Sequence, residues 1–480
     1  MDTVATLLSR LQFAFTISFH IIFPSLSIGL AAWLSVLEAL RLATGRQVYR
    51  TLFEFWRKIF GMVFGLGVVS GIVMAFQFGT NWSELSRISG PIQGPLLSYE
   101  TFTAFYLEAS FLGIVLFGRS RVPPWLYMIS TVMLALGTTL SAFWIMANNS
   151  WMQVPVGYVM KSGVATPTDW SKILFNSVLW VRFPHMLLAS FITGTFCVAA
   201  TGAWYVLRRQ FAEEARVMLR MGLYFAALLL PLQLFFGHLN GDYVHERQPA
   251  KFAAIEGRWH DEQPASEVLL AIPDGGSERN RYSLSVPVLG SVIGSMSFNS
   301  KEVGLLDFPP QDRPPVAIPF FAFRIMVGCG LLMLAMSWVG TWLGRRGRLE
   351  QSRVLMWLTF FSFPLPFIAI LTGWFTAEVG RQPWAIYGLL RTAQAATPAL
   401  SEHSVGTSLA VSIVTYSCIF AFGSIYIHRL LRLGPTAQLT APNRNATARR
   451  PMSVVDEQVA PQDLDALIAA SPATSALLEK

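Results

Sequence analysis

The sequence predicts an all-α fold, a polytopic membrane helical bundle of about nine transmembrane helices, and two observations carry this prediction. Of the 480 residues, 53% are hydrophobic and only 13% are charged, and the mean hydropathy is +0.46. This composition is typical of membrane bundles and not of soluble domains. The second observation is a series of apolar runs, each long enough, at about 20 residues, to cross roughly 30 Å of hydrocarbon. These runs cover residues 11–40, 53–79, 96–117, 124–146, 179–207, 217–239, 320–343, 354–375 and 407–431.

Clusters of basic residues follow every odd-numbered run. In order they are Arg41, Arg46, Arg50, Arg57 and Lys58, then Arg119 and Arg121, then Arg208, Arg209, Arg216 and Arg220, then Arg345, Arg346, Arg348 and Arg353, and finally Arg429 and Arg432. Because Lys and Arg are enriched in cytoplasmic loops, we expect the N-terminus outside and the C-terminus in the cytoplasm. The net charge of +8 then faces anionic membrane lipid, and nucleic acid is not an expected partner.

The runs divide the chain into four parts. Residues 1–239 hold helices one to six, 240–319 form an outer loop, 320–433 hold helices seven to nine, and 434–480 form a tail that we expect to be disordered in the cytoplasm. The outer loop is too long to be a turn. No helix or strand pattern dominates after Glu267, so we expect its later half to be mobile. The first run lacks a basic start and a cleavage site, and is expected to remain as a helix.

Ionisable and ligand-type side chains gather in the outer halves of the predicted helices. They are His20 on the first, Glu100 and Glu108 on the third, His185 on the fifth, Arg324 and Met326 on the seventh, and Glu378 and Arg381 at the end of the eighth. A charge at membrane depth costs roughly 2.5 to 3.5 kcal/mol, so such residues need partners or a function. Imidazole, thioether and carboxylate groups are all axial ligands of haem iron. Haem is therefore the cofactor that this set suits best.

Glu100 and Glu108 form a second pattern. Eight residues apart, they differ by about 80° around an α-helix and share one side of it at two depths. Stacked acids in a membrane favour a proton relay, which Ser141 on the fourth helix is placed to continue. The alternative is that Glu100 lies in the outer interface and Glu108 pairs with a cation such as Arg381.

Seven stretches in a fixed order carry a family resemblance. They are LSRLQFAFTISFHIIFP, SYETFTAFYLEASFLG, WIMANNSWMQVPVG, VRFPH, GDYVHERQPAKFAAIEGRW, FRIMVG and GWFTAEVGRQPW. With them the chain resembles subunit I of the cytochrome bd quinol oxidases, including the cyanide-insensitive branch, over residues 7–431.

The resemblance implies three haems. His185 and Met326 would bind a low-spin haem b, with Arg324 close to it. His20 and Glu378 would be axial ligands of two high-spin haems, one a haem b and the other a haem d or a third haem b. Which ligand serves which haem stays open. The resemblance also implies that Trp374 lies between haems and that Arg381 neutralises Glu378 or a haem propionate.

The resemblance also implies the reaction and its partners. The outer loop would bind ubiquinol or menaquinol through Lys251 and Glu256, and Glu100, Glu108 and Ser141 would carry protons to the oxygen site. Quinol would be oxidised outside and O2 reduced to water with cytoplasmic protons, contributing to the proton gradient without pumping. The expected location is the bacterial inner membrane. The expected partners are membrane lipid and a subunit II, with or without a small single-helix accessory subunit. The resemblance implies no role for His238, His245 and His260.

Two other functions fit parts of the sequence. A bis-histidine cytochrome b carrier would need histidine pairs on shared helices, but the seven histidines are spread singly. A cofactor-free proton-coupled transporter or channel would use Glu100, Glu108, His20 and Glu378 as a relay. Haem absorption bands distinguish this last alternative from an oxidase.

Overall fold

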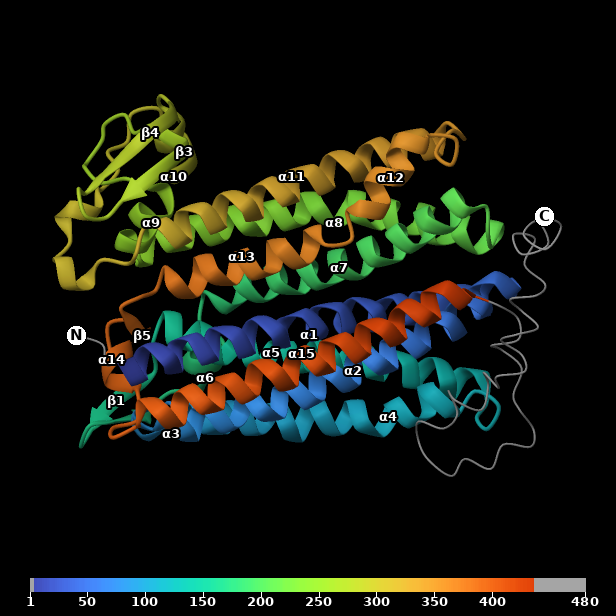
Figure 1. Ribbon diagram of the computed structural model, residues 1–480, viewed down its shortest axis with the longest axis horizontal. Coiled ribbons are helices and arrows are strands. Elements are labelled where there is room, and N and C mark those ends of the chain that lie inside the picture. The colour runs from blue at the N-terminus through green and yellow to red at the C-terminus, as the bar shows by residue number, and fades with distance from the viewer. Residues whose placement is uncertain (1–3, 436–480) are drawn as a thin grey trace, which may run out of the picture.

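The computed structural model describes residues 4–435, so nearly all of the predicted tail lies outside the described residues. Long helices lie side by side along one axis, and short helices and hairpins gather at one end (Figure 1). The prediction of a membrane helical bundle is confirmed. The uninterrupted long helices are α1 (Val4–Thr44), α2 (Gln47–Thr80), α5 (Pro124–Gln153), α7 (Leu179–Arg208), α8 (Ala212–Arg247), α11 (Ala317–Arg345) and α15 (Glu402–Leu433).

Two of the predicted spans are interrupted. The third consists of α3 (Ser83–Tyr99), a π-helical segment η1 (Glu100–Phe105) and α4 (Tyr106–Phe117), which follow one another without a gap. The eighth consists of α12 (Arg353–Phe361) and α13 (Leu365–Val379), which meet at a bend of 40°. Pro364 lies in this break, where a missing backbone N–H and the ring disfavour a continuous helix. Counting the bent pair as one span, the described residues contain nine spans, as predicted.

The short elements at the hairpin end come from three connections, namely those between α5 and α7, between α8 and α11, and between α13 and α15. In this order the elements are β1 (Tyr158–Lys161), β2 (Val164–Pro167) and α6 (Trp170–Leu174); α9 (Pro249–Glu256), β3 (Glu267–Asp274), β4 (Arg279–Val286), α10 (Leu289–Ser295), η2 (Leu305–Asp307) and η3 (Pro310–Asp312); and β5 (Trp384–Ile386), β6 (Leu390–Arg391) and α14 (Thr392–Ala395). Each sheet is a two-stranded antiparallel hairpin.

The expectation that the outer loop lacks regular structure after Glu267 is wrong. Strand β3 pairs with β4, and Asp274 closes the turn by accepting hydrogen bonds from the backbone of Gly276 and Ser277. Register shifts on either side of Leu270 interrupt the pairing. Because such bulges break the alternation of apolar and polar residues, the pattern by which a strand is recognised is missing from the sequence.

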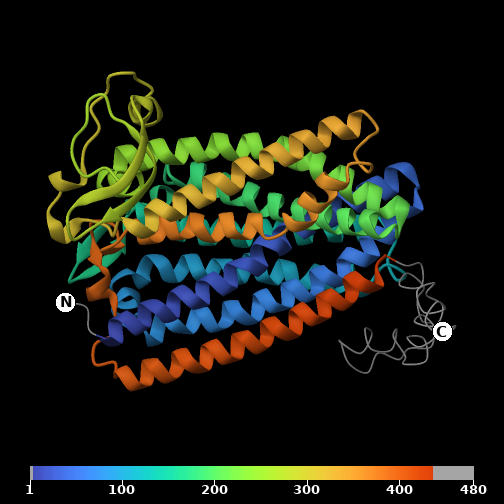
Figure 2. The same ribbon diagram turned by 45° about the horizontal axis from the view of Figure 1, so that its top comes forward.

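Most of the long helices form two packed groups, and α5 contacts both of them through α1 and α7. One contains α1, α2 and α15, and the other contains α7, α8, α11 and α13; in Figure 2, α15 lies on the side of the bundle away from α8 and α11. Helices α1 and α7 join the groups at a close backbone contact, where a Cβ on Gly29 would lie 2.9 Å from the Gly194 Cα. Only glycine permits so close an approach.

Candidate haem and quinol site

The Glu378 carboxylate lies at the C-terminal end of α13 and is contacted from two other helices. Arg381 Nη2 is 2.6 Å from Oε2, while Asn149 Nδ2 and Gln153 Nε2 of α5 donate to Oε1 at 3.0 and 3.1 Å. Arg182 of α7 lies 3.8 Å away. The expected pairing of Arg381 with Glu378 is therefore observed. The alternative in which Arg381 serves Glu108 is not.

Lys251 connects the outer loop to this carboxylate. It lies on α9 and is buried, and its Nζ donates to the Ala377 carbonyl at 2.9 Å and to Gln153 Oε1 at 3.3 Å. Because the same Gln153 donates to Glu378, one amide links Lys251 to the Glu378 carboxylate. Burial, and then the nearby Arg182 charge, lower the pKa of Lys251 to about 7. A lysine in this environment exchanges its proton near neutral pH.

A cavity of about 220 Å³ opens beside Lys251. Three segments line it: α9 with Lys251, the end of the outer loop, and the segment after α13. The lining residues of the last two include Phe308, Pro309, Asp312, Pro314, Arg381, Trp384 and Tyr387. Arg391 stacks on Trp384 and pairs with Asp312, and so fastens the outer loop to this segment. The cavity thus combines aromatic walls with a titratable amine, as organic ligands require.

Glu256, on the same helix as Lys251, is buried and lies in a separate ionic group. Burial, and then the neighbouring Glu256 carboxyl, raise the pKa of Glu267 above its usual range. Arg324 Nη2 lies 3.5 Å from Glu267 and donates to the Val268 carbonyl, while Arg324 Nη1 donates to the Ile255 carbonyl. Arg324 therefore anchors α9 and β3 to α11.

His185 and Met326 face helices that have glycine at the contact. A Cβ on Gly237 of α8 would lie 3.3 Å from His185 Cε1, and one on Gly373 of α13 would lie 2.9 Å from the Met326 sulfur. The His185 Nδ1 is buried without a hydrogen-bond partner, whereas Gln233 contacts Nε2 at 3.2 Å. Both residues belong to the group of α7, α8, α11 and α13.

His20 lies in the other helix group. Its Nδ1 is 3.0 Å from the Ser70 hydroxyl of α2, and a Cβ on Gly71 would lie 3.1 Å from its ring. The aromatic ring of Phe19 stacks on Tyr416 of α15 beside it. Trp374 of α13 packs against a buried cluster of Met146, Ala147 and Leu179, which come from α5 and α7.

These surroundings fit haem. The four candidate ligands supply imidazole, thioether and carboxylate donors, and each keeps part of its surface accessible inside the bundle; for the Glu378 side chain the fraction is 29%. Polar atoms of Arg182, His185 and Arg381 are buried without hydrogen-bond partners. A bound haem with its iron and propionates would provide such partners. Glycines opposite three of the ligands let these side chains pack closely against the neighbouring helix. Among the described residues there is no cluster of His, Cys, Asp and Glu that would hold a bare metal ion.

Comparisons with known proteins decide the family. A model of cytochrome bd terminal oxidase subunit I matches residues 8–435. The chain belongs to this family.

Similar proteins agree with this assignment. Cytochrome bd ubiquinol oxidase subunit 1 of Bacillus subtilis is 35% identical over 434 residues, which cover 88% of this chain and 90% of that protein. Cytochrome bd-II ubiquinol oxidase subunit 1 of Escherichia coli is 33% identical, over 90% of this chain and 97% of that protein. The bd oxidase structure from Geobacillus thermodenitrificans superposes with a TM-score of 0.84 at 28% identity, covering 91% of this chain and 100% of that one.

The resemblance recognised in the sequence is therefore confirmed. This cytochrome bd subunit I is an integral membrane part of an oxidoreductase, as expected, and its family implies haem cofactors and a subunit II partner. The roles of individual residues stay predictions.

In this cytochrome bd subunit, the predicted acid pair lies apart from Glu378. Ser141 of α5 donates to Glu100 at 2.7 Å, as its expected role requires, and Trp144 donates to Thr103 close by. Glu108 is buried against Gly137, and among the described residues no ion pair is recorded for it. Because Glu100 begins a π-helical segment, the angle of 80° assumed for a regular α-helix does not hold between the two acids.

Asn149, Gln153 and Arg182 were missed as site residues. All three lie in stretches that carry the family resemblance, WIMANNSWMQVPVG and VRFPH. A polar residue at every turn of one helix, as at Asn149 and Gln153, is the signal that could have identified them. Two of the histidines without an implied role pair with other acids: His245 is 2.7 Å from the buried Glu302, and His238 is 3.6 Å from Asp242.

Proposed function

We propose that the chain is the haem-carrying subunit of a quinol oxidase, which oxidises ubiquinol or menaquinol at the outer face and reduces O2 to water with cytoplasmic protons. Because the two half-reactions would release and take up protons on opposite sides of the membrane, the reaction would contribute to the proton gradient without pumping. One observation carries the proposal: Lys251 lines the cavity in the outer loop and shares Gln153 with Glu378. Family membership favours this function over a cytochrome b carrier or a cofactor-free transporter.

The quinol head group would lie in the 220 Å³ cavity beside Lys251. Quinol loses two protons as it loses two electrons, so a base must lie at its hydroxyls. Lys251, with its pKa lowered to about 7 by burial, can accept one proton. Trp384 would pack on the ring and Arg381 would hold the oxygens. Glu256 is buried five residues beyond Lys251 on α9 and would receive a proton on its way out.

Four residues would hold the haems. His185 and Met326 are the candidates for the low-spin haem b, and His20 and Glu378 for the high-spin haem b and for haem d or a third haem b. Bound haem supplies one-electron transfer and, where one axial position stays open, a site for O2. Arg182 and Arg381 would neutralise Glu378 and the propionates, because their guanidinium groups hold buried N–H donors without partners. Trp374 would fill the space between the haem sites.

Protons for water formation would pass along Glu108, Glu100 and Ser141. The Ser141 hydroxyl already donates to Glu100, and the buried Glu108 has no cation against it among the described residues. A carboxyl that is free of a fixed cation can change its protonation state, as a relay requires. Subunit II, with or without a small single-helix subunit, would complete the oxidase.

The proposal is tested on the purified complex in its membrane or in nanodiscs. The reduced-minus-oxidised spectrum and a pyridine haemochrome should reveal haem bound to the complex, and quinol should drive oxygen consumption. A complex without haem bands would refute the oxidase. Haem bands together with oxygen consumption from artificial donors alone would refute the quinol site but not the haem site.

A further inference from the structure

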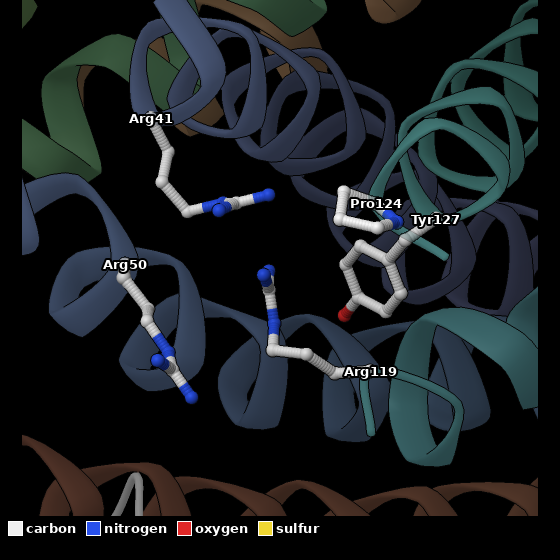
Figure 3. A pocket seen from close by; sticks show the side chains of 5 residues that line it. All are labelled: Arg41, Arg50, Arg119, Pro124 and Tyr127. Atoms are coloured by element: carbon white, nitrogen blue, oxygen red, sulfur yellow. The ribbon is translucent and has the colours of Figure 1, made fainter. Parts of the chain in front are cut away.

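The opposite end of the bundle holds a cavity that the proposed reaction does not use. Figure 3 shows Arg41 and Arg119 pointing toward each other across it, with Arg50 on one side and Pro124 and Tyr127 on the other. Its volume is about 160 Å³. Since a water molecule occupies roughly 30 Å³ in the liquid, the space is large enough for a phosphate group.

The helices bring these arginines together from separate parts of the chain. Arg41 is in the last turn of α1, Arg50 is near the start of α2, and Arg119 follows α4. Tyr127 donates from α5 to the Val115 carbonyl at 2.6 Å and supports the Arg119 guanidinium, which lies 4.1 Å above its ring. The walls of the cavity are thus fixed by contacts between four helices.

Two buried glutamates orient some of these arginines. Glu38 accepts from Arg41 at 2.7 Å and from Arg119 at 2.8 Å. Glu54 lies 2.6 Å from Arg119 and 2.5 Å from Arg57. The carboxylates hold the guanidinium groups of Arg41 and Arg119 in place at the wall of the cavity.

The charges in this cluster do not balance. Four arginines, Arg41, Arg50, Arg57 and Arg119, meet two carboxylates, which leaves an excess of two positive charges. Within residues 4–435 no ion pair is recorded for Arg50, and its Nε is buried without a hydrogen-bond partner. A buried guanidinium donor without an acceptor is costly, and an anion in the cavity would supply the acceptor.

We propose that this cavity binds a phosphate-type oxyanion. Guanidinium groups recognise phosphate oxygens through paired N–H donors, and the cavity lies at the helix ends where the basic clusters predict the cytoplasmic face. The ligand is the head-group phosphate of an anionic phospholipid or free phosphate. The two share the same chemistry, and the test distinguishes them.

The test measures binding of fluorescent phosphatidylglycerol to the delipidated, detergent-purified whole complex, with fluorescent phosphatidylcholine as the neutral comparison. The test variant is Arg50→Gln, because Arg50 holds no carboxylate in place. The matched control is Arg121→Gln, which removes one exposed charge from the loop of Arg119 without touching the cavity. The haem spectrum of each variant checks that the complex is assembled.

Wild type and the Arg121 variant should bind phosphatidylglycerol more tightly than phosphatidylcholine, and the Arg50 variant should lose about tenfold in that affinity. Lipid binding that resists competing inorganic phosphate identifies the head group as the ligand. If inorganic phosphate itself binds to wild type and about tenfold more weakly to the Arg50 variant, free phosphate is the ligand. Equal affinities of wild type and the Arg50 variant for both phosphatidylglycerol and inorganic phosphate would overturn the proposal.

Discussion

At the scale of single residues, the environment of Lys251 determines what the outer cavity can do. An ammonium without a carboxylate against it is poorly stabilised when buried, and the hydrogen bonds of Lys251 go to neutral groups, Ala377 and Gln153. The lowered pKa of Lys251 follows from burial first and from the Arg182 charge second. The sequence could not predict this, because Lys251 would be an ordinary surface lysine without its folded surroundings.

Replacing Lys251 with Met should lower quinol-driven oxygen consumption by about a hundredfold, the size of a general-base contribution. Oxygen consumption from an artificial donor should persist. In wild type the quinol rate should rise with pH through about 7, because the amine accepts a proton only when it is neutral. Lys251→Arg keeps the positive charge but cannot accept a proton, and should be nearly inactive at every pH. A Met variant with the wild-type rate and pH profile would exclude this role.

His185→Ala should remove the low-spin haem absorption while the complex still assembles in the membrane. The imidazole is the proposed ligand, and its buried Nδ1 has no hydrogen-bond partner among the described residues. His238→Ala serves as the control, since 42% of that side chain is exposed and it lies 3.6 Å from Asp242. Retention of the low-spin band in the His185 variant would require another ligand for that haem.

At the scale of elements, the sequence predicted the long helices well and the irregular ones poorly. Apolar runs determine that a span exists, but they do not show that α12 and α13 bend by 40° or that Glu100 starts a π-helical segment. Helix α8 continues to Arg247, beyond the predicted apolar run that ends at Leu239. The residues that it adds are polar, as expected outside the predicted hydrocarbon region. The β3–β4 hairpin was missed because its bulges hide the strand pattern.

Arg324 gives the hairpin a testable anchor. It joins β3 and α9 to α11 through backbone carbonyls and faces Glu267. Arg324→Ala should cost about 2 kcal/mol locally, because the backbone carbonyls of Ile255 and Val268 lose a charged hydrogen-bond donor. We expect faster proteolysis within residues 267–286 and a higher KM for quinol.

The control for this change is Arg281→Ala, which removes an exposed ion pair with Asp274 inside the same hairpin. Exposed pairs contribute little, so its proteolysis rate should stay near that of wild type. If both variants were cleaved at the same rate, Arg324 would not be the anchor.

At the scale of the whole molecule, the candidate ligands divide between two helix groups. His20 lies with α1, α2 and α15, whereas His185, Met326 and Glu378 lie with α7, α8, α11 and α13. The sequence placed all four at one level but could not assign them to groups, because neighbouring helices in a bundle are not distinguished by hydropathy. Any function that joins these residues depends on how the two groups pack.

The contact between Gly29 and Gly194 offers a test of that packing. A Cβ on Gly29 would lie 2.9 Å from the Gly194 Cα, so Gly29→Ala must push α1 and α7 apart. Overpacking of this kind costs about 1 to 3 kcal/mol. The midpoint of thermal unfolding of the complex should fall by a few degrees, and the absorption of the haem that we propose at His20 should shift. Gly90→Ala in α3 is the control, since a Cβ there meets no atom within 4 Å. A Gly29 variant as stable as the control, with an unchanged spectrum, would mean that the two helix groups are not held by this contact.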